Sequence, residues 1–339
     1  MNDRYSRQIL FPGIGKEGQE KMGRKHVLLI GAGALGSGNA EVLARAGVGK
    51  ITIIDRDYVE ASNLQRQQLY TEEDVAERLP KAAAAKKRLT AINSDIEIIA
   101  IIGDATPEVL REKIVGVDVI IDATDNFETR MAINDVSQKY SIPWIYGACV
   151  GSFGMSFSII PGKTPCFNCL VRTVPLQGMT CDTGGIISPA VQMVIAHQTA
   201  EAMKILAEDW GAIRTSFVSF DLWRNQYTSM KMSKAKFSGC LSCGENRTYP
   251  YLESENMTKT TVLCGRDTVQ IRPSTTGEIS LEQLAGQLSV LGYIVKGNPY
   301  LLSVEMGKER MVIFKDGRAL IHGTKDLTHA KTVYQRILG

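Results

Sequence analysis

Three glycines and one acidic residue stand at the spacing of a nucleotide-binding turn. Gly31, Gly33 and Gly36 form a G-x-G-x-x-G run after an apolar stretch, and Asp55 closes a second apolar stretch about 20 residues later. Glycines let the backbone approach phosphate oxygens, the next helix offers free N–H groups, and the acid accepts hydrogen bonds from ribose hydroxyls. The pattern predicts a nucleotide site at the first turn of a doubly wound sheet.

Basic and amide side chains accompany this turn in a number that a dinucleotide does not require. Asn63 and Arg66 follow the second apolar stretch, Lys81 begins a predicted helix, and Arg7 lies near the N-terminus. Several cations match the charge of a triphosphate, and Asp125, at the end of a later strand, is suited to hold Mg²⁺. The polar residues therefore favour ATP over a redox dinucleotide.

Four of the seven cysteines form two C-x-x-C pairs. Cys166 and Cys169 make up the first pair, and Cys240 and Cys243 make up the second. Two thiolates from each pair can surround one tetrahedral ion, and four sulfur ligands suit Zn²⁺. No open ligand position is evident, so we expect a structural zinc that closes a loop of about 70 residues.

The remaining cysteines differ in their surroundings. Cys181 lies in a glycine-rich stretch after the first pair, where a thiol could capture an acyl group or relay sulfur. The alternative is a loop cysteine without a catalytic role. Cys149, in an apolar stretch, is interpreted as a core residue. The four histidines form neither a metal-binding nor a triad pattern, and His197 is expected to be packed on its helix.

Strands alternate with helices through the first half of the chain. The predicted strands are residues 26–30, 50–55, 96–102, 117–126 and 143–150, and the predicted helices are residues 37–46, 80–92, 107–115 and 127–140. This order predicts an α/β fold: a doubly wound, Rossmann-like, mostly parallel sheet with helices on both faces. Such a sheet binds ligands at the carboxyl ends of its strands, where the polar residues above lie.

The chain is predicted to contain two domains. Residues 1–248 would form the nucleotide-binding domain with its zinc knuckle, and the polar stretch 249–260 would be a linker. Residues 261–339 are predicted to form a small α+β domain of unknown role, in which Cys264 is expected to be buried. This second part contains no rhodanese-like cysteine loop, so we expect an interaction or packing role.

Size, charge and hydropathy limit the class of protein. The chain has 339 residues and a net charge of +3, which gives no reason to expect nucleic-acid binding. No apolar run reaches about 18 residues, so no membrane-spanning helix is predicted. The N-terminus has no apolar core of signal-peptide length. We therefore expect a cytoplasmic protein with reduced cysteines.

Six motifs, in order, resemble the MoeB and ThiF family of adenylating proteins, bacterial relatives of the ubiquitin-activating enzymes. They are "RYSRQ", "GAGALG", "IIDRD", "SNLQRQ", "PKAAAA" and "DATDN", and the resemblance covers roughly residues 1–248. One departure is minor: Ala34 stands where many members have glycine. We expect nucleotide binding to tolerate the added methyl group.

The resemblance implies an ATP- and Mg²⁺-dependent adenylyltransferase that activates the C-terminal Gly-Gly carboxylate of a ubiquitin-like sulfur carrier. It further implies a homodimer in which Arg7 reaches the triphosphate in the neighbouring subunit, and a sulfurtransferase or cysteine desulfurase as a further partner. The candidate catalytic residues are Arg7, Arg66, Lys81, Asp125 and Cys181. The candidate nucleotide-binding residues are Gly31, Gly33, Ala34, Gly36, Asp55, Asp57, Ser62, Asn63, Leu64, Gln65, Arg66, Lys81, Asp125 and Asn126.

Several alternatives stay open. The carrier could be MoaD-like, for molybdopterin synthesis, or ThiS-like, for thiamine synthesis, with a slight preference for molybdopterin that no residue supports. An NAD-dependent dehydrogenase would share the glycine turn but would not need Arg66 and Lys81. A relative that activates a carboxylate in modified tRNA is mildly disfavoured by the near-neutral charge. A non-enzymatic zinc-bearing scaffold would share the cysteines.

Overall fold

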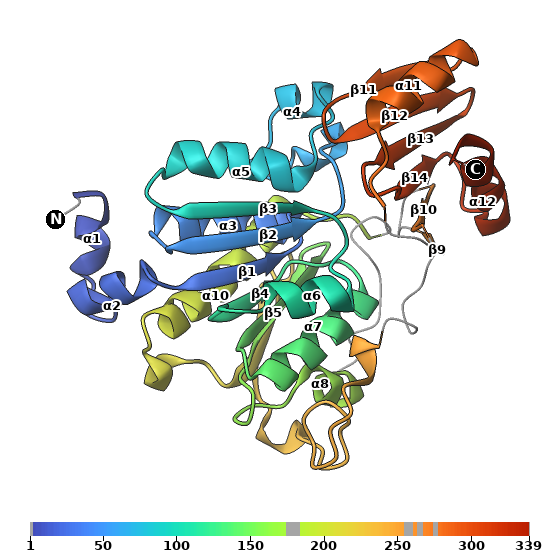
Figure 1. Cartoon of the computed structure of the whole chain (residues 1–339). Helices are drawn as coiled ribbons and strands as arrows, with labels where there is room; N and C mark the ends of the chain where they lie inside the picture. Colours follow the sequence, from blue (N-terminus) through green and yellow to red (C-terminus); the bar gives the residue numbers. More distant parts are fainter. Residues whose placement is uncertain (1–2, 174–183, 254–259, 263–266, 274–276, 339) are drawn as a thin grey trace. The chain divides into compact units, whose positions relative to one another are not determined.

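The computed structural model describes residues 3–173, 184–253, 260–262, 267–273 and 277–338, and the chain divides into two compact units. Unit 1 comprises Met1–Ala76 and Pro80–Asn256, and unit 2 comprises Glu77–Leu79 and Met257–Gly339. Figure 1 shows the elements of both units. Each unit is described by itself.

Unit 1 is built on an eight-stranded sheet with the order β3-β2-β1-β4-β5-β6-β7-β8. Its strands are β1 (His26–Ile30), β2 (Lys50–Asp55), β3 (Glu97–Ile102), β4 (Val119–Asp122), β5 (Trp144–Val150), β6 (Phe153–Ile159), β7 (Ser216–Asp221) and β8 (Gln226–Lys231). The strands from β3 to β5 pair in parallel, and β6, β7 and β8 add antiparallel pairs at one edge. The predicted doubly wound, mostly parallel sheet is confirmed.

Helices cover both faces of this sheet. They are α1 (Ser6–Ile9), α2 (Gly15–Met22), α3 (Ala34–Arg45), α4 (Glu72–Ala76), α5 (Lys81–Ile92), α6 (Pro107–Lys113), α7 (Phe127–Tyr140), α8 (Phe167–Thr173) and α10 (Ser188–Leu206). The 3-10 turns are η1 (Asp3–Tyr5), η2 (Ala61–Asn63), η3 (Trp210–Ala212), η4 (Ser233–Ala235) and η5 (Pro250–Leu252). Leu252, in the stretch expected to be a linker, is buried in the core of unit 1.

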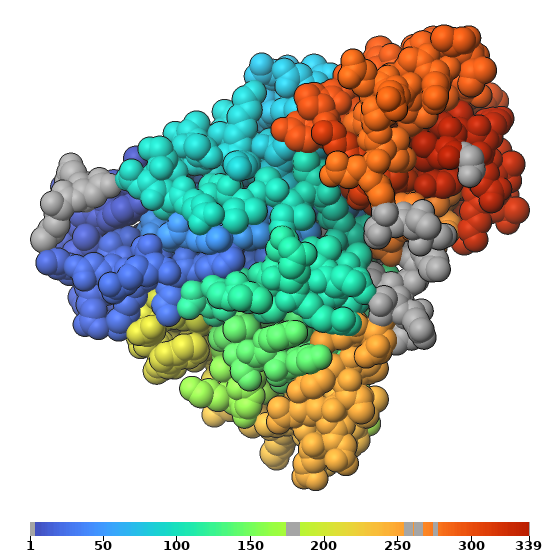
Figure 2. All heavy atoms as spheres, viewed as in Figure 1, coloured from blue at the N-terminus to red at the C-terminus, as the bar shows by residue number. Residues whose placement is uncertain are grey.

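Two apolar clusters pack helices of unit 1 against its sheet. One joins the strands to α6, α7 and α8, with Trp144 and Phe167 among its largest side chains. The other joins α3 and α10 to β7. Because β1 is covered on both faces, its residues form a continuous apolar run rather than an alternating one. In the space-filling view, α6 and α7 hide the strands beneath them (Figure 2).

Unit 2 is a six-stranded antiparallel sheet with two helices, as the predicted α+β class requires. Its order is β11-β12-β13-β14-β10-β9. The elements are β9 (Thr260–Val262), β10 (Thr268–Ile271), α11 (Leu281–Val290), β11 (Ile294–Gly297), β12 (Leu301–Met306), β13 (Glu309–Phe314), β14 (Ala319–His322) and α12 (Leu327–Leu338). Apolar residues of both helices and of four strands form one core.

Among the described residues, no helix combines the length and the apolar character that a bilayer crossing requires.

Candidate functional site

The glycine turn between β1 and α3 combines close backbone packing with one open face. Gly31 has a φ of 95°, and a Cβ there would collide with the carbonyl oxygen of Ala123; a Cβ at Gly36 would collide with that of Gly31. Packing therefore requires both glycines. At Gly33, outside its chain neighbours and its own helix, a Cβ would have one neighbour within 4 Å among the described residues, the Nε2 atom of Gln67 at 3.9 Å. The face of Gly33 is open to a ligand.

The N-terminus of α3 supplies the chemistry of an anion site. Gly33 precedes the helix, Ala34 begins it, and in the described part of the chain no side chain caps it. The first N–H groups of a helix have no partner within the helix, and they carry the positive end of its dipole. The turn is therefore suited to a phosphate group.

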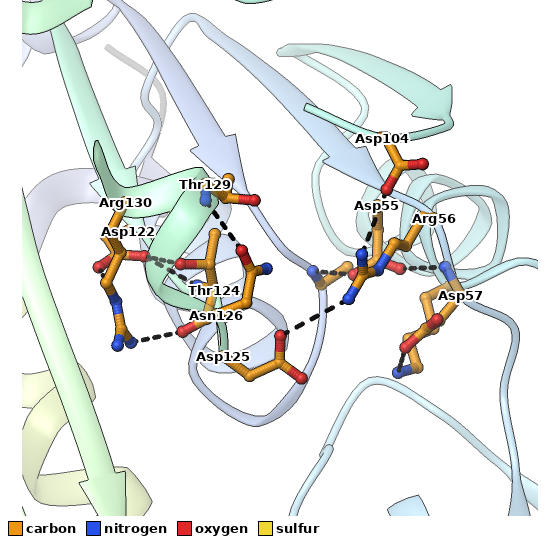
Figure 3. Close-up of polar contacts among 12 residues, drawn as sticks. Asp55, Arg56, Asp57, Asp104, Asp122, Thr124, Asp125, Asn126, Thr129 and Arg130 are labelled. Atoms are coloured by element: carbon orange, nitrogen blue, oxygen red, sulfur yellow. Dashed lines mark hydrogen bonds and ion pairs between the residues drawn. The ribbon is translucent and has the colours of Figure 1, made fainter. Parts of the chain in front are cut away.

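Asp55 ties the end of β2 to the glycine turn (Figure 3). Its Oδ2 accepts a hydrogen bond from the N–H of Ala32 at 2.5 Å, and its Oδ1 accepts one from the N–H of Asp57 at 2.7 Å. Burial raises the pKa of the Asp55 carboxyl, although the nearby Lys81 ammonium opposes the shift. The carboxyl group lies where a doubly wound nucleotide site places a ribose.

Lys81 places an ammonium group close to the same edge of the sheet. Its side chain is 4% exposed, and its Nζ lies 3.1 Å from Oδ2 of Asp57. The backbone N–H of Lys81 also donates to the Asp57 carbonyl oxygen at 2.9 Å. A buried ammonium requires a charged partner of this kind. The two contacts fix the start of α5 beside the end of β2.

The loop after β2 contains a buried amide with an unused donor. Asn63 is fully buried, and its Oδ1 accepts a hydrogen bond from the N–H of Glu60 at 3.1 Å. Its Nδ2 has no hydrogen-bond partner among the described residues. Arg66 is held within its own loop, because its Nη1 donates to the Ser62 carbonyl oxygen at 2.8 Å. The other candidate residues of the loop are the half-buried Leu64 and the exposed Gln65.

A buried ion pair stabilises the turn between β4 and α7 (Figure 3). Nε of Arg130 lies 3.0 Å from Oδ2 of Asp122, and Oδ1 of Asp122 accepts hydrogen bonds from the N–H and the hydroxyl of Thr124 at 2.8 and 2.7 Å. Nη2 of Arg130 donates to the Thr124 carbonyl oxygen at 2.6 Å. These contacts hold the turn in which Asp125 and Asn126 follow.

Asp125 and Asn126 have different surroundings on this turn. Oδ1 of Asn126 accepts a hydrogen bond from the N–H of Thr129 at 2.8 Å and so caps α7. The Asp125 side chain is 78% exposed, and its Oδ1 lies 4.0 Å from Nη2 of Arg56. Arg56 also contacts Asp104 at 3.3 Å, after the end of β3. Asp125 therefore keeps an accessible carboxylate that suits a magnesium ion.

Arg7 is not brought to the glycine turn of its own chain. It lies exposed on α1. The neighbouring Tyr5 hydroxyl accepts a hydrogen bond from Asn93 at the end of α5, and Gln8 donates one to the Ala46 carbonyl oxygen at the end of α3. These helices begin at the carboxyl edge of the parallel strands and run back, so α1 lies at the opposite edge (Figure 1). The other candidate catalytic and nucleotide-binding residues, apart from Cys181, follow the ends of β1, β2 and β4 or begin α5.

Three residues of this site were not selected from the sequence: Arg56, Gln67 and Arg130. Arg130 follows Asn126 by one helical turn, a spacing that could have indicated a side chain directed back at the strand end. Arg56 stands between two predicted site residues and could have been included on that ground. No signal in the sequence alone shows that the amide of Gln67 is buried.

The four paired cysteines come together in unit 1. Sγ of Cys166 lies 3.6 Å from Sγ of Cys240, and Sγ of Cys169 lies 3.5 Å from Sγ of Cys243. All four are buried, and all their sulfur atoms lie within 4.8 Å of one another. Zinc–sulfur bonds of about 2.3 Å would place tetrahedral sulfurs about 3.8 Å apart. The donor set and its spacing therefore fit a zinc ion with four thiolate ligands.

Purified protein should contain about one zinc ion per chain. A double variant with Cys240→Ser and Cys243→Ser should lose that zinc, because two hydroxyls replace half of the thiolates. Elemental analysis by mass spectrometry measures the content, and Cys149→Ser, outside the cluster, is the matched control. Full zinc occupancy in the double variant would rule out this ligand set.

The remaining cysteines and His197 lie outside the nucleotide site and the zinc cluster, or outside the described residues. Cys181 and Cys264 lie outside the described residues, so their roles stay predictions. Cys149 is half-buried and packs against the α3–α10 cluster. His197 is half-buried as well, with Nδ1 2.9 Å from Nη1 of Arg214 and its ring near that of Phe220.

Comparisons with known proteins agree with this geometry. The chain matches the ThiF family over residues 5–242. It is 51% identical over 339 residues, 100% of both chains, to the sulfur carrier protein ThiS adenylyltransferase of Bacillus subtilis. It is 32% identical to the molybdopterin-synthase adenylyltransferase of Salmonella typhimurium, over 71% of this chain and 96% of that one. A crystal structure of Escherichia coli MccB with ATP shares the fold, with a TM-score of 0.62 at 23% identity over 72% of this chain and 75% of that one. The chain belongs to the ThiF family.

Proposed function

We propose that this protein is an ATP-dependent adenylyltransferase that activates the C-terminal carboxylate of a ubiquitin-like sulfur carrier. The observation that carries the proposal is the full-length identity of 51% to a protein named for adenylating ThiS. The nucleotide geometry at the ends of β1, β2 and β4 supports it. A dehydrogenase, a scaffold and a tRNA-directed enzyme are not favoured by these relatives.

The carrier is proposed to be ThiS-like. The ThiS adenylyltransferase of Bacillus subtilis matches all of this chain, whereas the molybdopterin-synthase adenylyltransferase of Salmonella typhimurium matches 71% of it. The slight preference for molybdopterin therefore gives way to thiamine synthesis. A MoaD-like carrier becomes the comparison substrate in the test.

The residues of the site suit an attack by the carboxylate of the carrier on the α-phosphate of ATP, both of which are anions. The open face of Gly33 and the N-terminus of α3 would hold phosphates, and Asp55 would hold the ribose. Arg66 and Lys81 would neutralise charge as a carboxylate oxygen bonds to the α-phosphorus and diphosphate leaves. Mg²⁺, when bound, would neutralise further phosphate charge, and Asp125 would hold it. No general base is required, because the attacking carboxylate is ionised at neutral pH.

The active form is proposed to be a homodimer. Arg7 is exposed on α1, away from the glycine turn of its own chain, and Leu10 and Phe11 beside it are 70% and 61% exposed. Adjacent exposed apolar residues suit a protein interface. A partner subunit covering this face would bring Arg7 to the triphosphate of the partner.

Sulfur transfer after adenylation would need a second protein. We propose a cysteine desulfurase or a sulfurtransferase as the donor, because the sequence of residues 261–339 contains no rhodanese-like cysteine loop. Cys181 is proposed either to attack the acyl-adenylate, forming a thioester and releasing AMP, or to accept a sulfane sulfur from a persulfide of the donor, which is left as a thiol. The adenylation step itself needs no thiol.

Pyrophosphate exchange tests the proposed function. Purified protein, ATP and Mg²⁺ should exchange labelled pyrophosphate into ATP only when a ThiS-like carrier with an intact Gly-Gly end is present. A carrier shortened by those two glycines is the control, and a MoaD-like carrier tests selectivity. Absence of exchange with both intact carriers would contradict the proposal, and faster exchange with the MoaD-like carrier would contradict the choice of carrier.

A further inference from the structure

Unit 2 includes a short segment of chain, Glu77–Leu79, that interrupts unit 1 in the sequence. The segment lies in the turn between α4 and α5 and ends two residues before Lys81, the first residue of α5. The rest of unit 2 begins at Met257, far later in the chain. The C-terminal unit therefore contains, within its own fold, the stretch of chain that leads into a lysine of the nucleotide site.

Asn298, in the loop between β11 and β12, holds this segment by its backbone. Its Nδ2 donates to the Glu77 carbonyl oxygen at 2.8 Å and to the Arg78 carbonyl oxygen at 3.1 Å. Its Oδ1 accepts hydrogen bonds from the N–H groups of Tyr300 and Leu301 at 2.9 and 3.0 Å. Both donors and both lone pairs of the amide are used. The oxygen fixes the amide to its own loop, and the nitrogen fixes the segment.

Arg78 adopts a backbone conformation that requires such support. Its φ is 50°, in the left-handed region that residues other than glycine rarely occupy. A residue of this kind persists only where its surroundings enforce the conformation, and such residues cluster at functional sites. Its Nη2 also lies 3.6 Å from Oε1 of Glu305 on β12. The backbone and the side chain of Arg78 are thus both held by the β11–β12 hairpin.

A short, stiff connection joins this turn to Lys81. Two residues separate Arg78 from Lys81, and the second of them, Pro80, has its φ fixed by its ring. The Tyr70 hydroxyl lies 3.3 Å from the Lys81 carbonyl oxygen and donates to the Ala32 carbonyl oxygen at 2.6 Å, in the glycine turn. A change in the left-handed turn would therefore be transmitted to the start of α5, beside the nucleotide site.

We propose that unit 2 supports adenylation, and that Asn298 is a positioning residue that holds Lys81 in place through the segment Glu77–Leu79. This inference rests on the proposed function, because it assumes that the Lys81 ammonium contacts the triphosphate. Without the amide, Arg78 relaxes from its strained conformation, and fewer molecules hold Lys81 where the phosphates bind. The apparent affinity for ATP falls in proportion to that population.

Asn298→Ala should weaken ATP binding about 5- to 30-fold, the equilibrium equivalent of one residue leaving the left-handed region. Binding of adenosine, which has no phosphate, should stay unchanged. Asn298→Asp is the sharper variant, because an ionised carboxylate still accepts from its own loop but cannot donate to the segment. It should weaken ATP binding at least as much as the alanine variant does. Titration calorimetry on the full chain measures both ligands.

Ser280→Ala is the matched control within unit 2. The Ser280 hydroxyl caps α11 by accepting a hydrogen bond from the N–H of Gln283 at 3.4 Å. Its loss should lower the melting temperature, as removal of a helix cap does, and leave ATP affinity unchanged. An equal loss of ATP affinity in Ser280→Ala and Asn298→Ala would overturn the inference, because general weakening of unit 2 would then explain both.

Lys81→Met tests whether Asn298 acts through the lysine. This variant should itself weaken ATP binding about 10- to 100-fold, the effect of losing a hydrogen bond between charged groups. In the Lys81→Met background, Asn298→Ala should cause no further loss, because the ammonium that it positions is absent. Losses that add in full would contradict the proposed route through Lys81.

The remaining outcomes separate this inference from the proposed function. Unchanged ATP affinity in both Asn298 variants would overturn the inference alone, provided that Lys81→Met shows its loss. Equal losses of ATP and adenosine binding would overturn it as well, because the amide would then only support the fold. If the wild type bound no ATP, or if Lys81→Met bound it as tightly as the wild type, the proposed function would fail at that step, and the inference would fail with it.

Discussion

Arg7→Ala should reduce pyrophosphate exchange by roughly 100-fold or more, while the protein stays folded and dimeric. Arg7 is exposed at the edge of the sheet opposite its own glycine turn, so its removal should leave the core intact. The expected loss comes from the triphosphate of the partner, which would lack one cation during the transfer. Exchange rates, circular dichroism and light scattering measure the three parts of this result.

A mixture of two inactive variants tests whether Arg7 acts across the dimer. Arg66→Ala should also be inactive, through the site of its own subunit. In a heterodimer with Arg7→Ala, one site would contain intact Arg66 and receive intact Arg7, and the other site would lack both. Random subunit exchange should then restore about a quarter of wild-type activity in a two-fold symmetric dimer. Verified heterodimers without activity would contradict the action of Arg7 across the interface, and a fully active monomer would contradict the need for a dimer.

The parts of the site that local sequence determines were predictable. Gly31 and Gly36 are required by contacts that any strand–turn–helix of this kind makes, and Asp55 follows at a fixed distance along the chain. The two cysteine pairs are likewise recognisable, because each pair places two sulfurs on one ion. The parallel order of the first five strands follows from their alternation with helices.

The contacts between distant segments were not predictable. Arg56 contacts Asp104, 48 residues away, and a pattern along the chain does not specify such a pair. The antiparallel strands β6 to β8 also escaped prediction, because short apolar runs do not indicate where they will pair. Whether Oε1 of Gln67 has a hydrogen-bond partner depends on atoms from other elements, so only the folded structure shows that it has none among the described residues.

Arg130→Met should lower the free energy of unfolding by about 3–5 kcal/mol near pH 8, because it leaves the buried Asp122 carboxylate without its cation. Asp122 is fully buried, and Nε of Arg130 lies 3.0 Å from its Oδ2. The guanidinium also stacks over the Tyr146 ring, with Cζ 5.2 Å from the ring centroid. The same change removes the donor to the Thr124 carbonyl oxygen, so the turn that carries Asp125 should loosen and exchange activity should fall.

The pH dependence of this loss identifies its cause. Burial already raises the pKa of Asp122 with Arg130 present, and removal of the cation should raise it further. When a carboxyl group has a higher pKa in the folded state than in the unfolded state, the protein loses stability as the pH rises from the unfolded-state pKa to the folded-state pKa. The deficit of Arg130→Met relative to wild type should therefore be smaller at pH 5 than at pH 8. Urea unfolding at both pH values measures it.

Two further variants separate the ion pair from general effects of losing an arginine. Arg224 pairs with Asp221 at 3.7 Å but is 75% exposed, so Arg224→Met should cost less than about 1 kcal/mol. The double variant Asp122→Asn with Arg130→Met has no buried charge at this position, and it should recover a large part of the stability, with little pH dependence. A loss in Arg130→Met that is equal at both pH values, or a double variant no more stable than the single one, would show that packing of Arg130, rather than its charge, holds the turn.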